Sequence, residues 1–170
     1  CFYPNLKILM YDDKVIGDNI QSIDTLVNNR MIIGDCILAI GDSELRRNIH
    51  SRIKENSNLN FPNIDLSQNS DYPISPLNSI GVGNIYMPGS ILGYNSQIGS
   101  FNIFGTNVGV GHDVVIGDFN FIGPNSFLAG NSKIGDFCKL SFGTFIMQNG
   151  ILNSNIKSMT YTDFYKKYKK

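Results

Sequence analysis

A parallel β-helix preceded by a small α/β segment is the fold class that this sequence predicts, so the protein is expected to be mainly β. Two observations carry that prediction. Bulky apolar residues recur at every sixth position through the second half of the chain, and glycine usually follows them. The first seventy residues lack this period and alternate apolar runs with helix-like patterns.

The six-residue period runs from Ile80 to Leu152. Its thirteen apolar positions are Ile80, Tyr86, Leu92, Ile98, Phe104, Val110, Ile116, Ile122, Leu128, Ile134, Leu140, Ile146 and Leu152. Four residues later comes a mostly small residue: Ser90, Ser96, Val108, Val114, Ser126, Ser132, Cys138 or Thr144. Each hexapeptide is expected to form one short strand and one corner. Three of them close a triangular coil of 18 residues, and the coils stack about 4.8 Å apart with the apolar residues inside.

Residues three positions after each apolar one test the 18-residue coil independently. They form three columns with that spacing: Phe101, Phe119 and Phe137; Asn107 and Asn125; and Asn95, Asp113, Asn131 and Asn149. One corner is therefore expected to carry aromatic rings. The other two are expected to carry residues that tolerate left-handed backbone.

The first seventy residues predict strand, helix, strand, helix and strand, as in an incomplete Rossmann-like layer. The predicted strands are "LKILMY" (6–11), "DCILAIGD" (35–42) and "LNFPNI" (59–64). The predicted helices are "QSIDTLVNN" (21–29), capped by Ser22, and "SELRRNIHSRIKEN" (43–56), capped by Asp42. Leu45, Ile49 and Ile53 are expected to share the buried face of the second helix.

These patterns divide the chain into three parts. Residues 1–70 are predicted to form the α/β domain, 71–158 the β-helix domain, and 159–170 a basic helical tail that includes "YKKYKK". The chain begins with Cys1 and not with Met, as expected of a fragment or of a chain whose start is missing.

Composition excludes several classes of function. Fourteen basic residues balance fourteen acidic ones, so no broad basic field is available for nucleic acid or an anionic membrane. No apolar run is long enough to span a membrane. Cys1, Cys36 and Cys138 form no CxxC pair, which argues against a disulfide framework or a zinc knuckle. A reducing, cytoplasmic location is expected.

One histidine interrupts the architectural pattern. His112 is expected to point outward at the edge of a corner, and Asp113 could hold its imidazole in one tautomer, as a general base requires. A surface histidine without a role is the alternative, and the residues alone leave both open. His50, on the second helix, is interpreted as an exposed or partly packed residue.

The organisation resembles the hexapeptide sugar acyltransferases, which include sialic acid O-acetyltransferases and nucleotide-amino-sugar N-acetyltransferases. Three segments carry the resemblance: "YDD" (11–13), "ILAIGDSELRRNI" (37–49) and "GHDVVIGDFNFIGPNSFLAG" (111–130). The resemblance implies a left-handed β-helix, a homotrimer, and direct acetyl transfer from acetyl-CoA to a sugar in surface-glycan biosynthesis. His112 would be the base and Asp113 the acid that orients it.

The resemblance also implies binding residues. Asp12, Asp13 and Gly41 would contact the nucleotide sugar. Acetyl-CoA would lie in a groove between subunits, beside Gly111, Phe121, Gly130 and Gly143. No metal is implied.

Three departures from the family pattern accompany the resemblance. The family's opening strand and glycine-rich loop have no counterpart before Cys1, the hexapeptides stop near Ile156, and Phe121 stands where many relatives have a second histidine. The leading hypothesis is N-acetylation of a nucleotide-linked amino sugar. O-acetylation of sialic acid or a related sugar and a non-catalytic trimeric scaffold stay open. A metal-dependent hydratase is disfavoured, because its zinc sites need several histidines.

Overall fold

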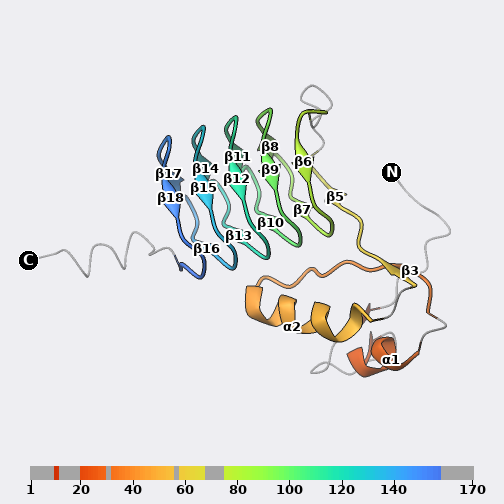
Figure 1. Cartoon of the computed structure of the whole chain (residues 1–170). Helices are drawn as coiled ribbons and strands as arrows, with labels where there is room; N and C mark the ends of the chain where they lie inside the picture. Colours follow the sequence, from red (N-terminus) through yellow and green to blue (C-terminus); the bar gives the residue numbers. More distant parts are fainter. Residues whose placement is uncertain (1–9, 12–19, 30–31, 56–57, 68–74, 158–170) are drawn as a thin grey trace, which may run out of the picture.

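The structure, a computed structural model, describes residues 10–11, 20–29, 32–55, 58–67 and 75–157. A stack of coils dominates it, and each coil is built from two-residue strands (Figure 1). Every strand from β6 onward that has a partner one coil later pairs with it in parallel, 18 residues on. For example, Ile103 lies opposite Phe121, and Val110 opposite Leu128. The predicted coil length is therefore confirmed.

The coils close a three-sided prism. Its first face holds β5 (Ile64–Asp65), β7 (Ile85–Tyr86), β10 (Ile103–Phe104), β13 (Phe121–Ile122) and β16 (Lys139–Leu140). Its second face holds β8 (Ile91–Leu92), β11 (Gly109–Val110), β14 (Phe127–Leu128) and β17 (Phe145–Ile146). Its third face holds β6 (Ser79–Ile80), β9 (Gln97–Ile98), β12 (Val115–Ile116), β15 (Lys133–Ile134) and β18 (Ile151–Leu152).

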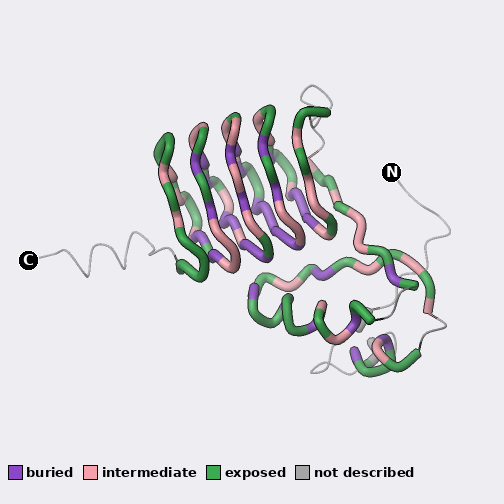
Figure 2. The backbone as a smooth tube through the Cα atoms, viewed as in Figure 1, coloured by how far each residue is buried: buried purple, intermediate pink, exposed green. Residues whose placement is uncertain are grey.

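The interior is the predicted apolar column. All thirteen apolar residues belong to one cluster, which Val108, Val114 and Cys138 complete from the small-residue positions. Nine of the thirteen are buried, and four (Ile80, Leu92, Ile146 and Leu152) are partly buried. Figure 2 shows buried residues recurring from coil to coil, while the last coil, with β17 and β18, is exposed or half-buried throughout. The outermost coils have a neighbour on one side only, so less of their apolar surface leaves water.

Asparagine occupies the small-residue position at one corner of the prism. Asn84, Asn102 and Asn120 are fully buried. The side-chain oxygen of Asn84 accepts from the backbone N–H of Asn102 (2.9 Å), and that of Asn102 accepts from Asn120 (2.8 Å). This row of hydrogen bonds ends at Cys138, whose N–H donates to the side-chain oxygen of Asn120 (2.7 Å). A buried amide is tolerated here because each one satisfies a corner N–H of the next coil.

The corner columns adopt left-handed backbone, as the asparagines predict, but the phenylalanine column does so too. Phe101, Phe119 and Phe137 have φ values of 59°, 56° and 56°. This conformation costs an aromatic residue roughly 1–2 kcal/mol. Two contacts offset that cost. The rings stack at centroid distances of 5.0 and 5.5 Å, and Arg46 donates to the carbonyls of Phe101 and Phe119.

The glycines that follow the apolar residues serve close approach and do not adopt positive φ. A Cβ on Gly93 would lie 2.4 Å from the carbonyl carbon of Gly111, and a Cβ on Gly111 would lie 2.7 Å from the nitrogen of Gly130. The backbone of the next coil thus occupies the space of a side chain, and positive φ falls two residues later, at residues such as Asp113.

Both helices of the α/β segment form where their caps predict. The helix α1 (Ile23–Asn28) begins after Ser22, whose hydroxyl accepts from the N–H of Asp24 (3.2 Å). The helix α2 (Ser43–Ile53) begins after Asp42, whose carboxylate accepts from the N–H of Leu45 (2.8 Å). In each case the cap satisfies a backbone donor that the first helical turn leaves free.

The strands of this segment are shorter than predicted. Of the expected strand at 6–11, only β1 (Met10–Tyr11) is described, and it pairs with β2 (Ile20–Gln21). The expected strand at 35–42 is wrong beyond β3 (Gly34–Asp35) and the hydrogen bond from the N–H of Cys36 to Asn60. Residues 37–42 run between α2 and the coils without a described ladder partner (Figure 1). The expected strand at 59–64 splits around Pro62, which has no N–H to donate.

The two halves of that split strand join different sheets. The strand β4 (Leu59–Asn60) pairs with β3, and β5 pairs with β7 of the prism. The first face of the β-helix therefore begins within the segment predicted as α/β. The predicted tail, 159–170, lies outside the described residues.

The buried face of α2 differs from the predicted one at its first turn. Ile49 and Ile53 are buried, but the side chain of Leu45 is exposed and Arg46 is only 1% exposed. The Arg46 guanidinium donates to the carbonyls of Phe101 (2.9 Å), Phe119 (2.9 Å), Asn120 (3.1 Å) and Ile40. Burial lowers the pKa of Arg46 to about 10, which leaves it charged at neutral pH. One arginine thus joins α2 to the phenylalanine corner.

Candidate active site at a corner of the β-helix

His112 lies at the corner between the second and third faces, just after β11. Its side chain is 45% exposed, and its Nδ1 lies 2.6 Å from Oδ2 of Asp113. Asp113 can turn back toward its neighbour because its backbone is left-handed, with φ of 56°. The outward position and the acidic partner that the sequence predicts are both present.

The Asp113 carboxylate has a second partner from the preceding coil. Nδ2 of Asn95 donates to Oδ1 of Asp113 at 2.5 Å, so each carboxylate oxygen accepts one hydrogen bond. The bond to His112 and then the bond from Asn95 lower the pKa of Asp113. An ionised acceptor at Nδ1 favours the tautomer with the proton on that nitrogen, which leaves the Nε2 lone pair free.

Two neighbours define the surroundings of the imidazole. The ring of Tyr94, one coil earlier, stacks on it at 5.5 Å between centroids and 16° between planes. Gly130, one coil later, lies beneath Nε2, and a Cβ on Gly130 would come within 2.7 Å of that atom. An exposed imidazole with a free Nε2, a fixed ring plane and open space beside it can take a proton from a bound nucleophile.

The structure brings some of the predicted site residues together and separates others. Gly111 and Gly130 lie with His112 at the same corner, where the glycine backbones of successive coils touch. Phe121 instead lies on the first face, with its ring edge 3.8 Å from where a Cβ on Gly41 would stand. Gly143, with φ of 66°, lies at the corner between the first and second faces, where a Cβ would meet nothing within 4 Å.

Gly41 is the one predicted sugar-contacting residue whose place is known. Asp12 and Asp13, the other two, lie outside the described residues.

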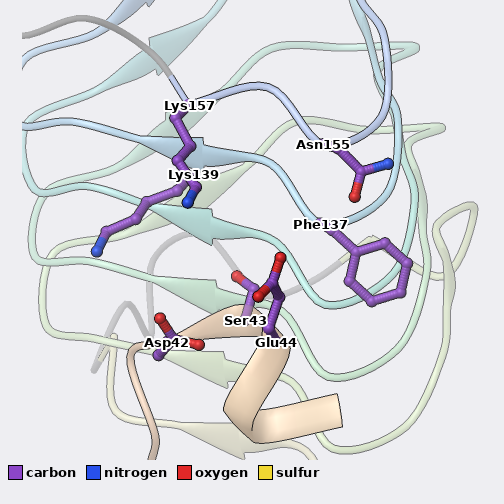
Figure 3. A pocket seen from close by; sticks show the side chains of 7 residues that line it. All are labelled: Asp42, Ser43, Glu44, Phe137, Lys139, Asn155 and Lys157. Carbon is purple, nitrogen blue, oxygen red and sulfur yellow. The ribbon is translucent and has the colours of Figure 1, made fainter. Parts of the chain in front are cut away.

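A pocket opens where α2 begins (Figure 3). Asp42, Ser43 and Glu44 line it from the helix, and Phe137, Lys139, Asn155 and Lys157 line it from the last coils. Ser43 is only 8% exposed, and its hydroxyl has no hydrogen-bond partner among the described residues. A buried hydroxyl without a partner is costly, so a ligand atom or water at Oγ would be stabilising.

Charge in this pocket is mixed. The N–H of Leu45 and, more weakly, the charges of Lys139 and Lys157 lower the pKa of Asp42. Asp42 caps the helix, and Glu44 adds a second negative charge. The two ammonium groups and the positive end of the α2 dipole are the features of the pocket that attract an anion.

The outer surface of the second face is apolar along its whole length. Ile91, Phe127, Phe145 and Met147 are all more than 40% exposed. The rings of Phe127 and Phe145 stack at 5.8 Å, and the ring of Phe127 also covers Gly109. This apolar strip runs from coil to coil beside the corner that carries His112.

Five residues at these sites were not predicted as site residues: Tyr94, Asn95, Ser43, Lys139 and Lys157. Tyr94 lies 18 positions before His112, and Asn95 lies 18 positions before Asp113. Applying the coil period to the candidate base and its acidic partner would therefore have found both. No sequence spacing predicts that Ser43 lines a pocket together with Lys139 and Lys157, because that pocket depends on how α2 packs against the prism.

The described ranges hold two cysteines. Cys36 and Cys138 are free, and burial raises the pKa of Cys36 to about 11. Among the residues placed by the structure, no group of three His, Cys, Asp or Glu side chains could hold a metal. None of the described helices is both long and apolar enough to cross a bilayer.

Several solved structures are similar to this chain. The acetyltransferase domain of PglB from Neisseria gonorrhoeae, in complex with acetyl coenzyme A, is 23% identical with a TM-score of 0.76, covering 89% of this chain and 74% of its own. A variant of perosamine N-acetyltransferase from Caulobacter crescentus, in complex with CoA and GDP-perosamine, is 22% identical with a TM-score of 0.63, covering 83% and 73%.

No protein-family model and no curated protein matches the chain. At this level of identity the structural similarity establishes the fold. The chain is a left-handed parallel β-helix preceded by a small α/β segment, the fold of these sugar acetyltransferase domains.

Proposed function

We propose that the protein transfers an acetyl group from acetyl-CoA to the amino group of a nucleotide-linked amino sugar. One observation carries the proposal: an outward imidazole is paired at 2.6 Å with an ionised acid, and its Nε2 is free over glycine. Two similar structures support the choice of donor and acceptor: an acetyltransferase domain in complex with acetyl coenzyme A, and a perosamine N-acetyltransferase in complex with CoA and GDP-perosamine.

In the proposed reaction His112 is the general base. The acceptor nitrogen attacks the thioester carbonyl carbon, and Nε2 takes the proton that this nitrogen loses. The carbon–sulfur bond then breaks, and the coenzyme A thiolate leaves and is protonated. Asp113 stabilises the imidazolium that forms, and holding both substrates at one corner supplies the proximity part of the rate enhancement.

The pocket at the start of α2 lies beside the first face, away from His112 of the same chain, so it is proposed to hold the phosphate end of a sugar nucleotide whose amino group reaches His112 of a second copy. Lys139 and Lys157 supply positive charge, and α2 supplies the positive end of its dipole, against the negative charges of Asp42 and Glu44. Ser43 supplies a buried hydroxyl without a partner among the described residues. Gly41 precedes Asp42 in the chain and stays a proposed contact.

The rise in Tm on adding each ligand tests whether the protein binds the proposed substrates. Acetyl-CoA and a nucleoside diphosphate are each expected to raise the Tm, because saturation at about a hundred times Kd stabilises by roughly 2.7 kcal/mol. Turnover is read as release of the coenzyme A thiol with nucleotide-linked amino sugars as acceptors. Replacing Lys139 and Lys157 together by methionine should weaken the shift by the diphosphate and leave that by acetyl-CoA intact. An unchanged Tm with acetyl-CoA would favour the non-catalytic scaffold.

A homotrimer built on the second face is proposed as the active assembly. An exposed apolar strip of this length is rare on a monomer, which favours an interface on this face. The strip borders the His112 corner, so a second copy bound there would form one side of a groove beside the imidazole.

A charge on this face tests the assembly. Replacing Phe145 by glutamate should convert trimer to monomer in sedimentation equilibrium, because a carboxylate would be buried without a partner. Replacing Gln97 by glutamate on the third face is the matched control and should leave the trimer intact. A wild-type chain that sediments as a monomer at micromolar concentration contradicts the trimer.

O-acetylation is the second candidate function. The described corner accepts a hydroxyl as well as an amine near Nε2, since both donate one proton to it. Parallel assays with amino and hydroxyl acceptors decide between them.

A further inference from the structure

The hydrogen bond between Asn95 and Asp113 is not part of the base–acid pair, and it holds the acid from the neighbouring coil. Asp113 is two-thirds buried at its side chain, and its carboxylate could rotate if only His112 held it. The amide of Asn95 reaches across one coil and donates to the oxygen that His112 does not use. The three side chains therefore form a directed chain from Asn95 through Asp113 to Nδ1 of His112.

We propose that Asn95 is a positioning residue, which acts through Asp113 to hold His112 as the Nδ1–H tautomer with Nε2 free to accept a proton. This inference rests on the proposed function for its catalytic meaning, but the tautomer itself is a property of the free protein. A histidine side chain in water prefers the other tautomer, with the proton on Nε2. That form could not act as a base at the open side of the corner.

The other contacts of the imidazole agree with this role. Tyr94 stacks on one face of the ring and fixes its plane, and Gly130 leaves room for Nε2. Neither of them distinguishes one ring nitrogen from the other. The hydrogen bond to Asp113 makes that distinction, and Asn95 is the residue that anchors Asp113 from the neighbouring coil.

The variant Asn95→Gly removes the side-chain amide and keeps the backbone conformation. Asn95 has φ of 56°, a conformation that glycine adopts without strain, so the corner is kept while the donor is removed. Asn107→Gly is the matched control. Asn107 has φ of 57° and donates to Asn125 one coil later (3.3 Å), at a corner away from His112.

Long-range 1H–15N NMR of the histidine rings tests the proposal. The chain has only two histidines, so a His50→Gln variant assigns both. In spectra of the neutral ring, His112 should carry its proton on Nδ1 in the wild type and in Asn107→Gly. In Asn95→Gly the ratio of Nδ1–H to Nε2–H should fall several-fold. An unchanged ratio in Asn95→Gly overturns the proposal.

Kinetics supply the second readout. Asn95→Gly should lower kcat about tenfold and leave the KM for acetyl-CoA unchanged, as expected when an outer partner of a functional group is removed. If no acceptor is turned over, the proposed function fails while the NMR ratio still decides the role of Asn95. If turnover is present and both kcat and the ratio are unaffected in Asn95→Gly, only the positioning role fails.

Discussion

Replacing His112 by alanine is expected to lower kcat/KM for acetyl transfer about a thousandfold, within the range that general-base catalysis contributes. The physical reason is the loss of the one free imidazole nitrogen at the corner, where Asp113 and Tyr94 have fixed the ring. The measurement is the rate of coenzyme A release under subsaturating acceptor. The Tm should change little, because the side chain is nearly half exposed.

Two further results complete that test. His112→Ala should still be stabilised by acetyl-CoA, which shows that binding survives the loss of the base. His50→Gln is the matched histidine control and should keep its activity, because His50 packs against Phe61, Phe101 and Phe119 and not at the His112 corner. Turnover by His112→Ala at the wild-type rate would contradict the mechanism.

Replacing Arg46 by alanine is expected to lower the free energy of unfolding by about 3 kcal/mol. The guanidinium donates to four buried or half-buried carbonyls, three of them on the β-helix corner, and leaving buried acceptors without donors costs roughly 1–3 kcal/mol each before water or relaxation compensates. The left-handed backbone of Phe101 and Phe119 loses a stabilising contact at the same time. Urea unfolding followed by far-UV circular dichroism measures the change.

Arg47 provides the matched control. It is the next residue on α2, is exposed, and lies over the ring of Phe137 at 5.0 Å from its centroid. Arg47→Ala should cost under about 1 kcal/mol, the value of an exposed cation–π contact. Equal destabilisation by the two variants would show that the buried hydrogen bonds of Arg46 do not hold α2 to the prism.

Much of the candidate site could be predicted because the β-helix is periodic. Once the interior column from Ile80 to Leu152 is recognised, His112 must lie outside the prism at a corner, and Asp113 must occupy a left-handed position beside it. The same period reaches Tyr94 and Asn95, whose stacking and hydrogen bond the structure then displays.

The position of Phe121 relative to His112 could not be predicted from the period. Its ring belongs to the first face beside Gly41, away from the His112 corner, although the resemblance placed it with the coenzyme-binding residues. Sequence spacing identifies the coil and the face of a residue, but it does not tell which side chains of separate elements meet across a groove.

By itself the sequence determined the coil length, the apolar interior, the corner columns and the two helix caps, because each follows from contacts between residues at fixed separations along the chain. The tertiary structure alone decided that Arg46 would be buried, that residues 37–42 would have no described ladder partner, and that Ser43 would line one pocket with two lysines. Those outcomes depend on how an irregular segment packs against a regular one, and a local pattern carries no information about that packing.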